Sequence, residues 1–267
     1  MPAKVQRMLA MTARAACVTF VAFFSSPGHA AELRVLSAAA MQSVFKEIRE
    51  EFQRTSGYRL VPHYGTIGAV NEWTIGGEEA DLIISSAQSM LSLVYQGKIQ
   101  AGSQTAICQT GIGVVTAAGI ELTVNSVEDF RRALLAAKVI VYADPARGGA
   151  AGIHVAKVIG QLGLTEQIKP KLRLAAGGDI TEVTLSLGPG ALGITQISEI
   201  ADKPEAQLAG RLPEELQNYT VFVAGVPANA PQSEGAKALL KFLRSPKVVA
   251  VIKTKGMKDF GSDGGSE

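Results

Sequence analysis

Cysteine, histidine and aromatic residues are scarce in this chain. It has two cysteines in 267 residues, and only Cys108 remains if the N-terminal leader described below is removed, which excludes an intramolecular disulfide. Aromatic residues make up 6% of the chain, whereas hydrophobic residues make up 47% and are mostly aliphatic. This composition favours layered α/β structure over a β-sandwich, held together by packing alone.

Several chemical motifs are also missing. No Gly-Lys-Ser/Thr sequence follows a glycine loop, and Gly111-Ile112-Gly113 lacks the third glycine of a dinucleotide-binding turn. There is no Gly-x-Ser-x-Gly elbow and no His/Glu metal motif, and His63 and His154 stand alone. We therefore expect no cofactor, no metal, no catalytic residue and no enzymatic activity. An exported enzyme remains an alternative, because residues distant in sequence can converge in space.

The N-terminus has the pattern of an export signal. Three basic residues precede an apolar run over 15–24, and small residues follow at 25–30. The pattern predicts a signal peptide over 1–30, cleaved after Ala30 or alternatively after Ala31, and hence a periplasmic protein. An uncleaved anchor is the other interpretation, but the run is shorter than the roughly 20 apolar residues that span a bilayer.

Neither sign of charge dominates once this leader is removed. The leader takes three of the 26 basic residues and no acidic residue, which leaves 23 basic against 24 acidic side chains, a net charge of −1. The mature chain thus lacks the basic surface that nucleic acids require, and we expect no nucleic-acid partner.

Apolar segments of strand length alternate with segments of helical periodicity along the mature chain. The predicted strands are 33–37, 59–64, 81–85, 112–116, 138–142, 171–174, 191–195 and 219–225. The predicted helices are the segment from 41 to Gly57, 70–75, 88–96, 126–137, 153–162, a short helix capped by Asp179, 232–243 and 246–254. Such alternation implies parallel sheets. The polar tail over 261–267 is expected to be disordered.

The stretch from Tyr64 to Val70 is a glycine-bounded turn between a strand and a helix. A helix start exposes unpaired N–H groups and the positive end of the helix dipole, which suit an anion. Thr66, Gly68 and Ala69 could supply a hydroxyl and N–H donors there.

Several motifs in fixed order resemble one protein family. They are Leu-Arg-Val-Leu-Ser-Ala-Ala-Ala-Met over 33–41, Ala-Asp-Leu-Ile-Ile-Ser over 80–85, Ala-Asp-Pro over 143–145 with Ala-Gly-Ile over 151–153, and Leu-Gly-Ile over 192–194. Together with the export signal they resemble the molybdate-binding-like branch of bacterial periplasmic solute-binding proteins over nearly the whole mature chain.

The resemblance implies a type II periplasmic binding protein fold: two α/β lobes, each a mainly parallel sheet flanked by helices, with the ligand cleft between them. Lobe 1 is expected to combine 31–110 and 222–267, and lobe 2 to comprise 111–221. A small anion would bind in the cleft, and the monomeric protein would deliver it to an inner-membrane ABC permease. A sensory protein on the same fold is a further alternative.

At three ligand-binding positions, the residue in this chain differs from the one that the resembled family typically has. Molybdate binders of this family hold the oxyanion with two serines and a tyrosine, but the matching positions are Ala40, Ile67 and Gln196. A one-residue shift of the alignment would bring in Ser37 or Thr66 instead. Burying a dianion without hydroxyl donors costs several kcal/mol, so a molybdate or tungstate ligand becomes the alternative to an organic carboxylate.

Arg147 lies in the loop before a predicted helix, where its guanidinium could grip a carboxylate in a bidentate way; a solvated loop arginine is the other interpretation. A carboxylate with two or three acid groups is the hypothesis that follows. The full predicted ligand-binding set is Ala39, Ala40, Thr66, Ile67, Gly68, Ala69, Arg147, Ala151, Ile180 and Gln196.

Overall fold

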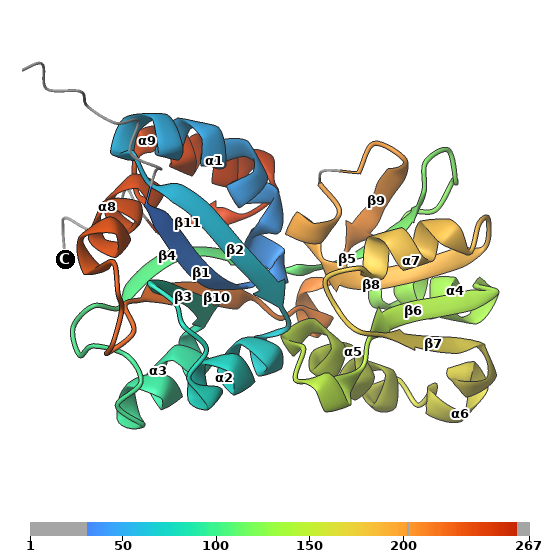
Figure 1. Ribbon diagram of the computed structural model, residues 1–267. Helices are drawn as coiled ribbons and strands as arrows, with labels where there is room; N and C mark the ends of the chain where they lie inside the picture. The colour runs from blue at the N-terminus through green and yellow to red at the C-terminus, as the bar shows by residue number, and fades with distance from the viewer. Residues whose placement is uncertain (1–30, 202, 261–267) are drawn as a thin grey trace, which may run out of the picture.

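Two β-sheets, each covered by helices, lie beside each other (Figure 1). The structure is a computed structural model that describes residues 31–201 and 203–260. The predicted signal peptide over 1–30 and the predicted disordered tail over 261–267 lie outside these residues. In the part of the chain that is described, no helix is long and apolar enough to cross a membrane.

The first sheet has six strands in the order β11-β4-β10-β3-β1-β2. They are β1 (Glu32–Ala38), β2 (Arg59–Gly65), β3 (Leu82–Ser86), β4 (Thr105–Thr110), β10 (Thr220–Gly225) and β11 (Lys258–Asp259). Five helices flank this sheet: α1 (Gln42–Ser56), α8 (Ser233–Leu243) and α9 (Pro246–Thr254) on one face, and α2 (Ile67–Gly76) and α3 (Ala87–Tyr95) on the other. The short 3₁₀ turn η1 (Ala39–Met41) joins β1 to α1.

The second sheet has five strands in the order β7-β6-β8-β5-β9. They are β5 (Ile112–Ala117), β6 (Val139–Ala143), β7 (Leu172–Ala175), β8 (Ala191–Gln196) and β9 (Ala206–Arg211). The helices around it are α4 (Val127–Ala136), α5 (Ala150–Gln161), α6 (Thr165–Ile168) and α7 (Ile180–Ser186). A 3₁₀ turn, η4 (Ile197–Glu199), follows β8, and three others are η2 (Pro145–Arg147), η3 (Lys169–Lys171) and η5 (Glu214–Leu216).

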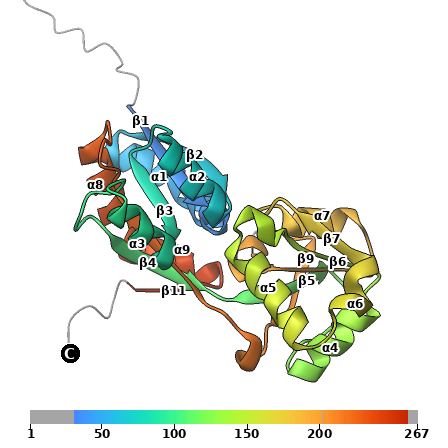
Figure 2. The same ribbon diagram turned by 90° about the horizontal axis from the view of Figure 1, so that it is seen from below.

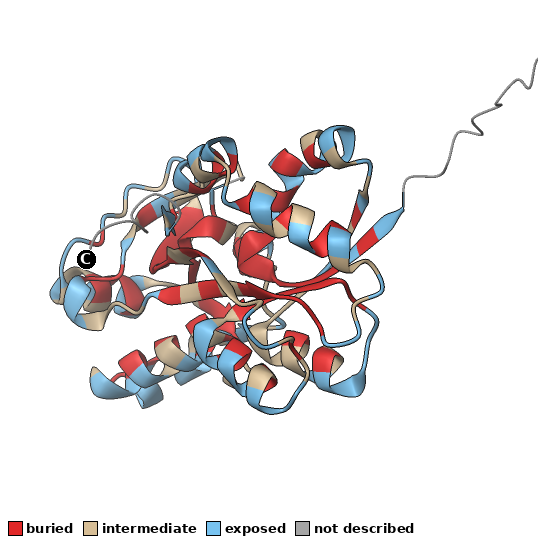
Figure 3. Cartoon of the chain, turned by 90° about the vertical axis from the view of Figure 1, so that its left-hand side faces the viewer, coloured by how far each residue is buried: buried red, intermediate tan, exposed pale blue. Residues whose placement is uncertain are grey.

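Each central strand contributes to two cores. In β1, Leu33 and Val35 pack beneath α1, α8 and α9, whereas Leu36 packs beneath α2 and α3. In β6, Ile140 faces the α5 side and Val141 the α7 side. Successive strand residues point to opposite faces, so strands covered by helices on both sides are apolar throughout. Figure 3 shows this as buried central strands beneath helices whose outer faces are exposed.

The two sheets are mixed, so the expectation of mainly parallel sheets needs correction. Parallel pairing holds for β2-β1-β3 in the first sheet and for β7-β6-β8 in the second. Strand β10 runs antiparallel to β3 and β4, and β5 runs antiparallel to β8 and β9. These strands flank the two places where the chain changes sheet, and a strand entering directly from the other sheet has no crossover helix to make it parallel.

Most predicted elements are present, but some limits were wrong. Helix α5 begins at Ala150 rather than Ile153. Gly152 was predicted to lie in the loop before the helix, but it is helical. It has to be glycine because it packs closely on β6: a Cβ there would lie 2.0 Å from the Ala143 carbonyl oxygen. Helix α2 begins at Ile67 rather than Val70. The prediction missed β4, β9 and β11. Strand β9 is an edge strand that buries only Ala209, so its sequence has no apolar alternation to detect.

The two crossing segments are tied together by one side chain. The chain leaves the first sheet after β4 and returns to it at β10, and Figure 2 shows the two sheets and their helices as separate bodies on either side of these crossings. The Gln217 amide accepts a hydrogen bond from the Ile112 N–H at 2.7 Å and donates to the Ile112 and Leu212 carbonyl oxygens at 3.0 and 3.1 Å. Residues on both crossings therefore share the half-buried amide of Gln217.

Two polar side chains accept hydrogen bonds from backbone N–H groups near helix starts. Asp81 is 2% exposed and accepts hydrogen bonds from the backbone N–H groups of Arg34 at 2.8 Å and Gln232 at 2.7 Å, so it joins β1 to the start of α8. Ser126 caps α4 by accepting a hydrogen bond from the Asp129 N–H at 3.1 Å. Cys108 is a buried free thiol in the first core.

Candidate functional site

A cavity of about 40 Å³ lies between the two sheets. From the first sheet it is lined by residues 38–40 after β1, residues 65–67 after β2, and Phe222. From the second sheet it is lined by Ala143 and residues 149–151 after β6, Gly177 and Gly178 after β7, and Thr195, Gln196 and Glu199 at the end of β8. The cavity thus lies at the carboxyl ends of the parallel strands of both sheets, where open α/β sheets bind ligands.

The start of α2 crosses the cleft and contacts the second sheet's loop directly. The Gly68 N–H donates to the Gly148 carbonyl oxygen at 3.1 Å, and Thr66 Oγ1 donates to the Arg147 carbonyl oxygen at 2.8 Å. Thr66 also caps its own helix by accepting from the Ala69 N–H at 3.1 Å. Of the donors expected to bind a ligand here, Thr66, Gly68 and Ala69 are therefore already used, and Ile67 keeps an N–H without a protein partner among the described residues.

Two other helix starts at the cavity have no side-chain cap. Neither η1, which leads into α1, nor α5 receives a side-chain hydrogen bond at its N-terminus. Both begin in residues that line the cavity, 38–40 and 149–151. Uncapped N–H groups and the positive ends of two helices consequently face the cavity from opposite sides, which is a suitable environment for an anion.

The structure brings six of the ten predicted site residues to the cavity. Those six are Ala39, Ala40, Thr66, Ile67, Ala151 and Gln196. Gly68 and Ala69 lie behind the lining in the first turn of α2, as described above. Ile180 is 1% exposed and packs with Val141 and Ala143 in the core of the second sheet, not along the cavity.

Arg147 does not place its guanidinium in the cavity. It is exposed, it is not among the lining residues, and its contact with the first sheet is made by its carbonyl oxygen. The sequence could not show this, because the side chain and the carbonyl of one residue point in different directions.

Glu199 is the residue that sequence reasoning missed. It lines the cavity from η4, and Thr195 Oγ1 donates a hydrogen bond to its Oε2. Burial raises the pKa of its carboxyl to about 7, with smaller contributions from the nearby charges of Glu182 and Asp179, against which the Thr195 hydrogen bond acts. Among the lining residues it is the one ionisable side chain. No motif surrounds it in the sequence.

Gln196 and Phe222 complete the wall. Gln196 is 5% exposed, and its Nε2 donates to Thr220 Oγ1 at 3.2 Å, so its amide is held toward the strand that returns to the first sheet. Phe222 is fully buried. The cavity therefore combines backbone donors, small apolar side chains and one protonatable carboxyl.

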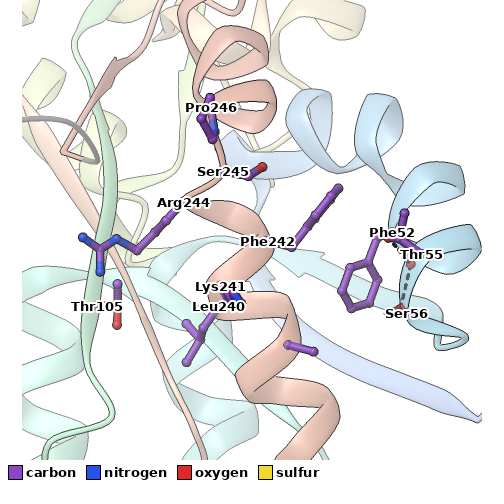
Figure 4. A pocket seen from close by; sticks show the side chains of 11 residues that line it. Phe52, Thr55, Ser56, Thr105, Leu240, Lys241, Phe242, Arg244, Ser245 and Pro246 are labelled. Carbon is purple, nitrogen blue, oxygen red and sulfur yellow. Dashed lines mark hydrogen bonds between the residues drawn. The ribbon is translucent and has the colours of Figure 1, made fainter.

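Other features of the described residues lie away from this cavity. A larger hollow of about 860 Å³ lies between the C-terminal end of α1 and the junction of α8 and α9. Figure 4 shows that Phe52, Phe242, Arg244 and neighbouring residues line it. Within residues 31–201 and 203–260, no three His, Cys, Asp or Glu side chains gather as metal ligands. His63 stacks on Trp73 and His154 contacts the Leu216 carbonyl oxygen at 2.7 Å.

The family model described as "Bacterial extracellular solute-binding protein" matches residues 33–258. The chain belongs to this family. The predicted resemblance and the two-lobe α/β fold are therefore confirmed. Proteins of this family are solute-binding components of ABC importers, which capture small ligands outside the cytoplasm and deliver them to a membrane permease; solute binding is their main activity.

Relatives within the solute-binding protein family differ in what they bind or act on. An aconitate isomerase from Pseudomonas sp is 23% identical over 85% of this chain and 87% of its own length. The molybdate-binding protein ModA from Azotobacter vinelandii is 25% identical over 85% of this chain and 90% of its own. The solved periplasmic molybdate-binding protein of Azotobacter vinelandii superposes with a TM-score of 0.72 at 20% identity, covering 84% of this chain and 98% of that one.

The contact between α2 and the Arg147–Gly148 loop predicts the effect of Gly68→Ala. A Cβ at Gly68 would lie 2.7 Å from the Arg147 carbonyl oxygen and 2.9 Å from Gly148 Cα. Both are backbone atoms, so relieving the overlap requires the main chain of the loop to shift. We expect the variant to open the cleft, to increase the radius of gyration measured by small-angle X-ray scattering, and to weaken ligand binding roughly 30-fold through two lost hydrogen bonds. Gly76→Ala at the end of α2, where a Cβ meets nothing within 4 Å, is the matched control. Unchanged scattering by Gly68→Ala would contradict the expectation.

Glu199 predicts a pH dependence of stability. Its folded pKa of about 7 lies above its ordinary value, so the folded protein holds the proton more tightly than the unfolded chain. The free energy of unfolding should therefore fall as pH rises from about 4.5 to about 7, and level off above that. Glu199→Gln should remove this fall in denaturant titrations at pH 5, 6, 7 and 8, whereas Glu166→Gln, at an exposed ion pair, should leave it in place. Parallel curves for wild type and Glu199→Gln would disprove the assignment.

Proposed function

We propose that this protein is the periplasmic substrate-binding component of an ABC importer, and that it binds a small organic carboxylate in the cavity between its lobes. The observation that carries the proposal is the pair of uncapped helix starts, η1 and α5, which face one cavity from opposite lobes. Backbone N–H groups of this kind bind carboxylate oxygens without a compensating basic side chain.

The lining favours a carboxylate over molybdate. Ala40, Ile67 and Gln196 stand where hydroxyl donors would be expected, and all three line the cavity. The two threonine hydroxyls that also line it, those of Thr66 and Thr195, donate to Arg147 and Glu199 and are not free. A tetrahedral dianion would therefore lose hydration without gaining the hydroxyl bonds that replace it.

The rest of the proposal follows the family. We assign lobe 1 to 31–110 and 222–267 and lobe 2 to 111–221, with export directed by a signal peptide over 1–30. The protein acts as a monomer, closes its lobes around the ligand and presents the closed form to the inner-membrane permease.

A thermal-shift screen of the mature protein tests this function. The probes are molybdate, tungstate, sulfate, acetate, succinate and citrate, with aconitate as an unsaturated tricarboxylate. A bound ligand at about 100 times its dissociation constant adds roughly 2.7 kcal/mol to the free energy of unfolding. We expect a carboxylate to raise the melting temperature and molybdate to leave it unchanged. A shift by molybdate with none by any carboxylate would establish the oxyanion alternative.

A second candidate function is isomerisation of an unsaturated carboxylate. Two observations favour it: Glu199 places a carboxyl with a pKa of about 7 in the cavity wall, and one relative is named an aconitate isomerase. A group with that pKa can take a proton from carbon and return it at neutral pH. In this scheme Glu199 removes an allylic proton, the double bond shifts, and the same proton is returned to the other end of the allyl system.

Proton exchange distinguishes binding from isomerisation. If the cavity only binds, cis-aconitate incubated with the protein in D₂O keeps its carbon-bound protons in the NMR spectrum. If Glu199 transfers protons, the methylene signal is lost or the trans isomer accumulates, and Glu199→Gln abolishes either change. Conversion that survives in Glu199→Gln would exclude this residue as the base.

A further inference from the structure

A second, more polar pocket adjoins the cavity. It has a volume of about 200 Å³, and it shares Ala39, Gly178 and Glu199 with the cavity wall. The rest of its lining comes from opposite lobes, because α1 and η4 contact each other across the cleft. The three shared residues, Ala39, Gly178 and Glu199, therefore separate the cavity from the pocket.

Two hydroxyls at this pocket lack hydrogen-bond partners. Ser43 on α1 is 8% exposed and Ser198 on η4 is 1% exposed, and both residues line the pocket. Their Oγ atoms are buried and have no hydrogen-bond partner among the described residues. A buried hydroxyl without a partner costs about 1–3 kcal/mol, so such groups are normally satisfied by water or by a ligand. The Ser43 hydroxyl belongs to the lobe of the first sheet, and the Ser198 hydroxyl belongs to the lobe of the second sheet.

The charges around the pocket leave one cation available. Lys203 forms an ion pair with Glu182, and both line the pocket. Lys46 also lines it, one turn after Ser43 on α1, and forms no ion pair within the described residues. Glu199 accepts a hydrogen bond from Thr195, and its raised pKa leaves it partly protonated near neutral pH. A second acid group would therefore meet an ammonium and two hydroxyls.

We propose that this pocket is a subsite for a second carboxylate of the ligand, held by Ser43, Ser198 and Lys46, while the first carboxylate occupies the cavity at the starts of η1 and α5. The inference rests on the proposed function and narrows its ligand class to di- and tricarboxylates. A monocarboxylate or a tetrahedral oxyanion fills the cavity alone and leaves both serine hydroxyls unsatisfied. Because the two hydroxyls come from different lobes, the second carboxylate also links the lobes in the closed form.

Calorimetric titration of acetate, succinate and citrate into the mature protein tests the subsite. In Lys46→Gln, and separately in the double variant Ser43→Ala/Ser198→Ala, we expect the dissociation constant for succinate or citrate to rise at least tenfold and that for acetate to change less than twofold. Arg54→Gln is the matched control: it removes one positive charge from an exposed position on the same helix, outside the pocket.

The outcomes separate the two proposals. Equal weakening of acetate and succinate in the subsite variants, or no change in either, overturns the subsite and leaves carboxylate binding in the cavity intact. Failure of wild type to bind any carboxylate overturns both. The double serine variant should unfold at the same or a higher denaturant concentration than wild type, because it removes two unsatisfied buried hydroxyls, and this confirms that any loss of affinity is not a loss of fold.

Discussion

The site depends on one backbone contact across the cleft. The start of α2 touches the loop after β6 so closely that Gly68 has room only for a hydrogen atom, and its N–H donates to Gly148 on the other lobe. Thr66 strengthens the same contact through the Arg147 carbonyl oxygen. Small residues are required on both sides of this contact because the two main chains meet directly. The cavity is enclosed where it is because the lobes touch here.

This contact also decides which polar groups remain for a ligand. It uses the Thr66 hydroxyl and the Gly68 N–H, whereas the uncapped starts of η1 and α5 keep their donors. The carboxyl of Glu199 is enclosed with them, and its burial raises its pKa to about 7. A site with backbone donors and a protonatable carboxyl, but without a basic side chain, can bind an anion and can exchange a proton with it.

The cavity and the adjoining pocket together limit the size and the number of acid groups of a ligand that would fill the cleft. The cavity of about 40 Å³ holds only a small group, and the adjoining pocket of about 200 Å³ supplies two hydroxyls and an ammonium beyond Glu199. In the binding mode that we propose, a ligand with acid groups at both ends occupies both spaces. The chain has relatives named for molybdate and for aconitate, and we propose that this division of the cleft favours one of these two kinds of ligand over the other.

The sequence by itself determined the α/β class, most strands and helices, and the helix starts that reach the cleft, because periodicity, glycine and capping residues act over a few neighbouring positions. Ala40, Ile67 and Gln196 were placed at the cavity on that basis together with the family pattern. Only the tertiary structure decided that Arg147 contributes a carbonyl rather than a guanidinium, that Ile180 is core, and that Glu199, Ser43 and Ser198 meet at the cleft. Those outcomes depend on which segments pack together in space, across the cleft for Arg147, Glu199, Ser43 and Ser198 and within the second sheet for Ile180. A local pattern carries no information about a packing partner that is distant in the sequence.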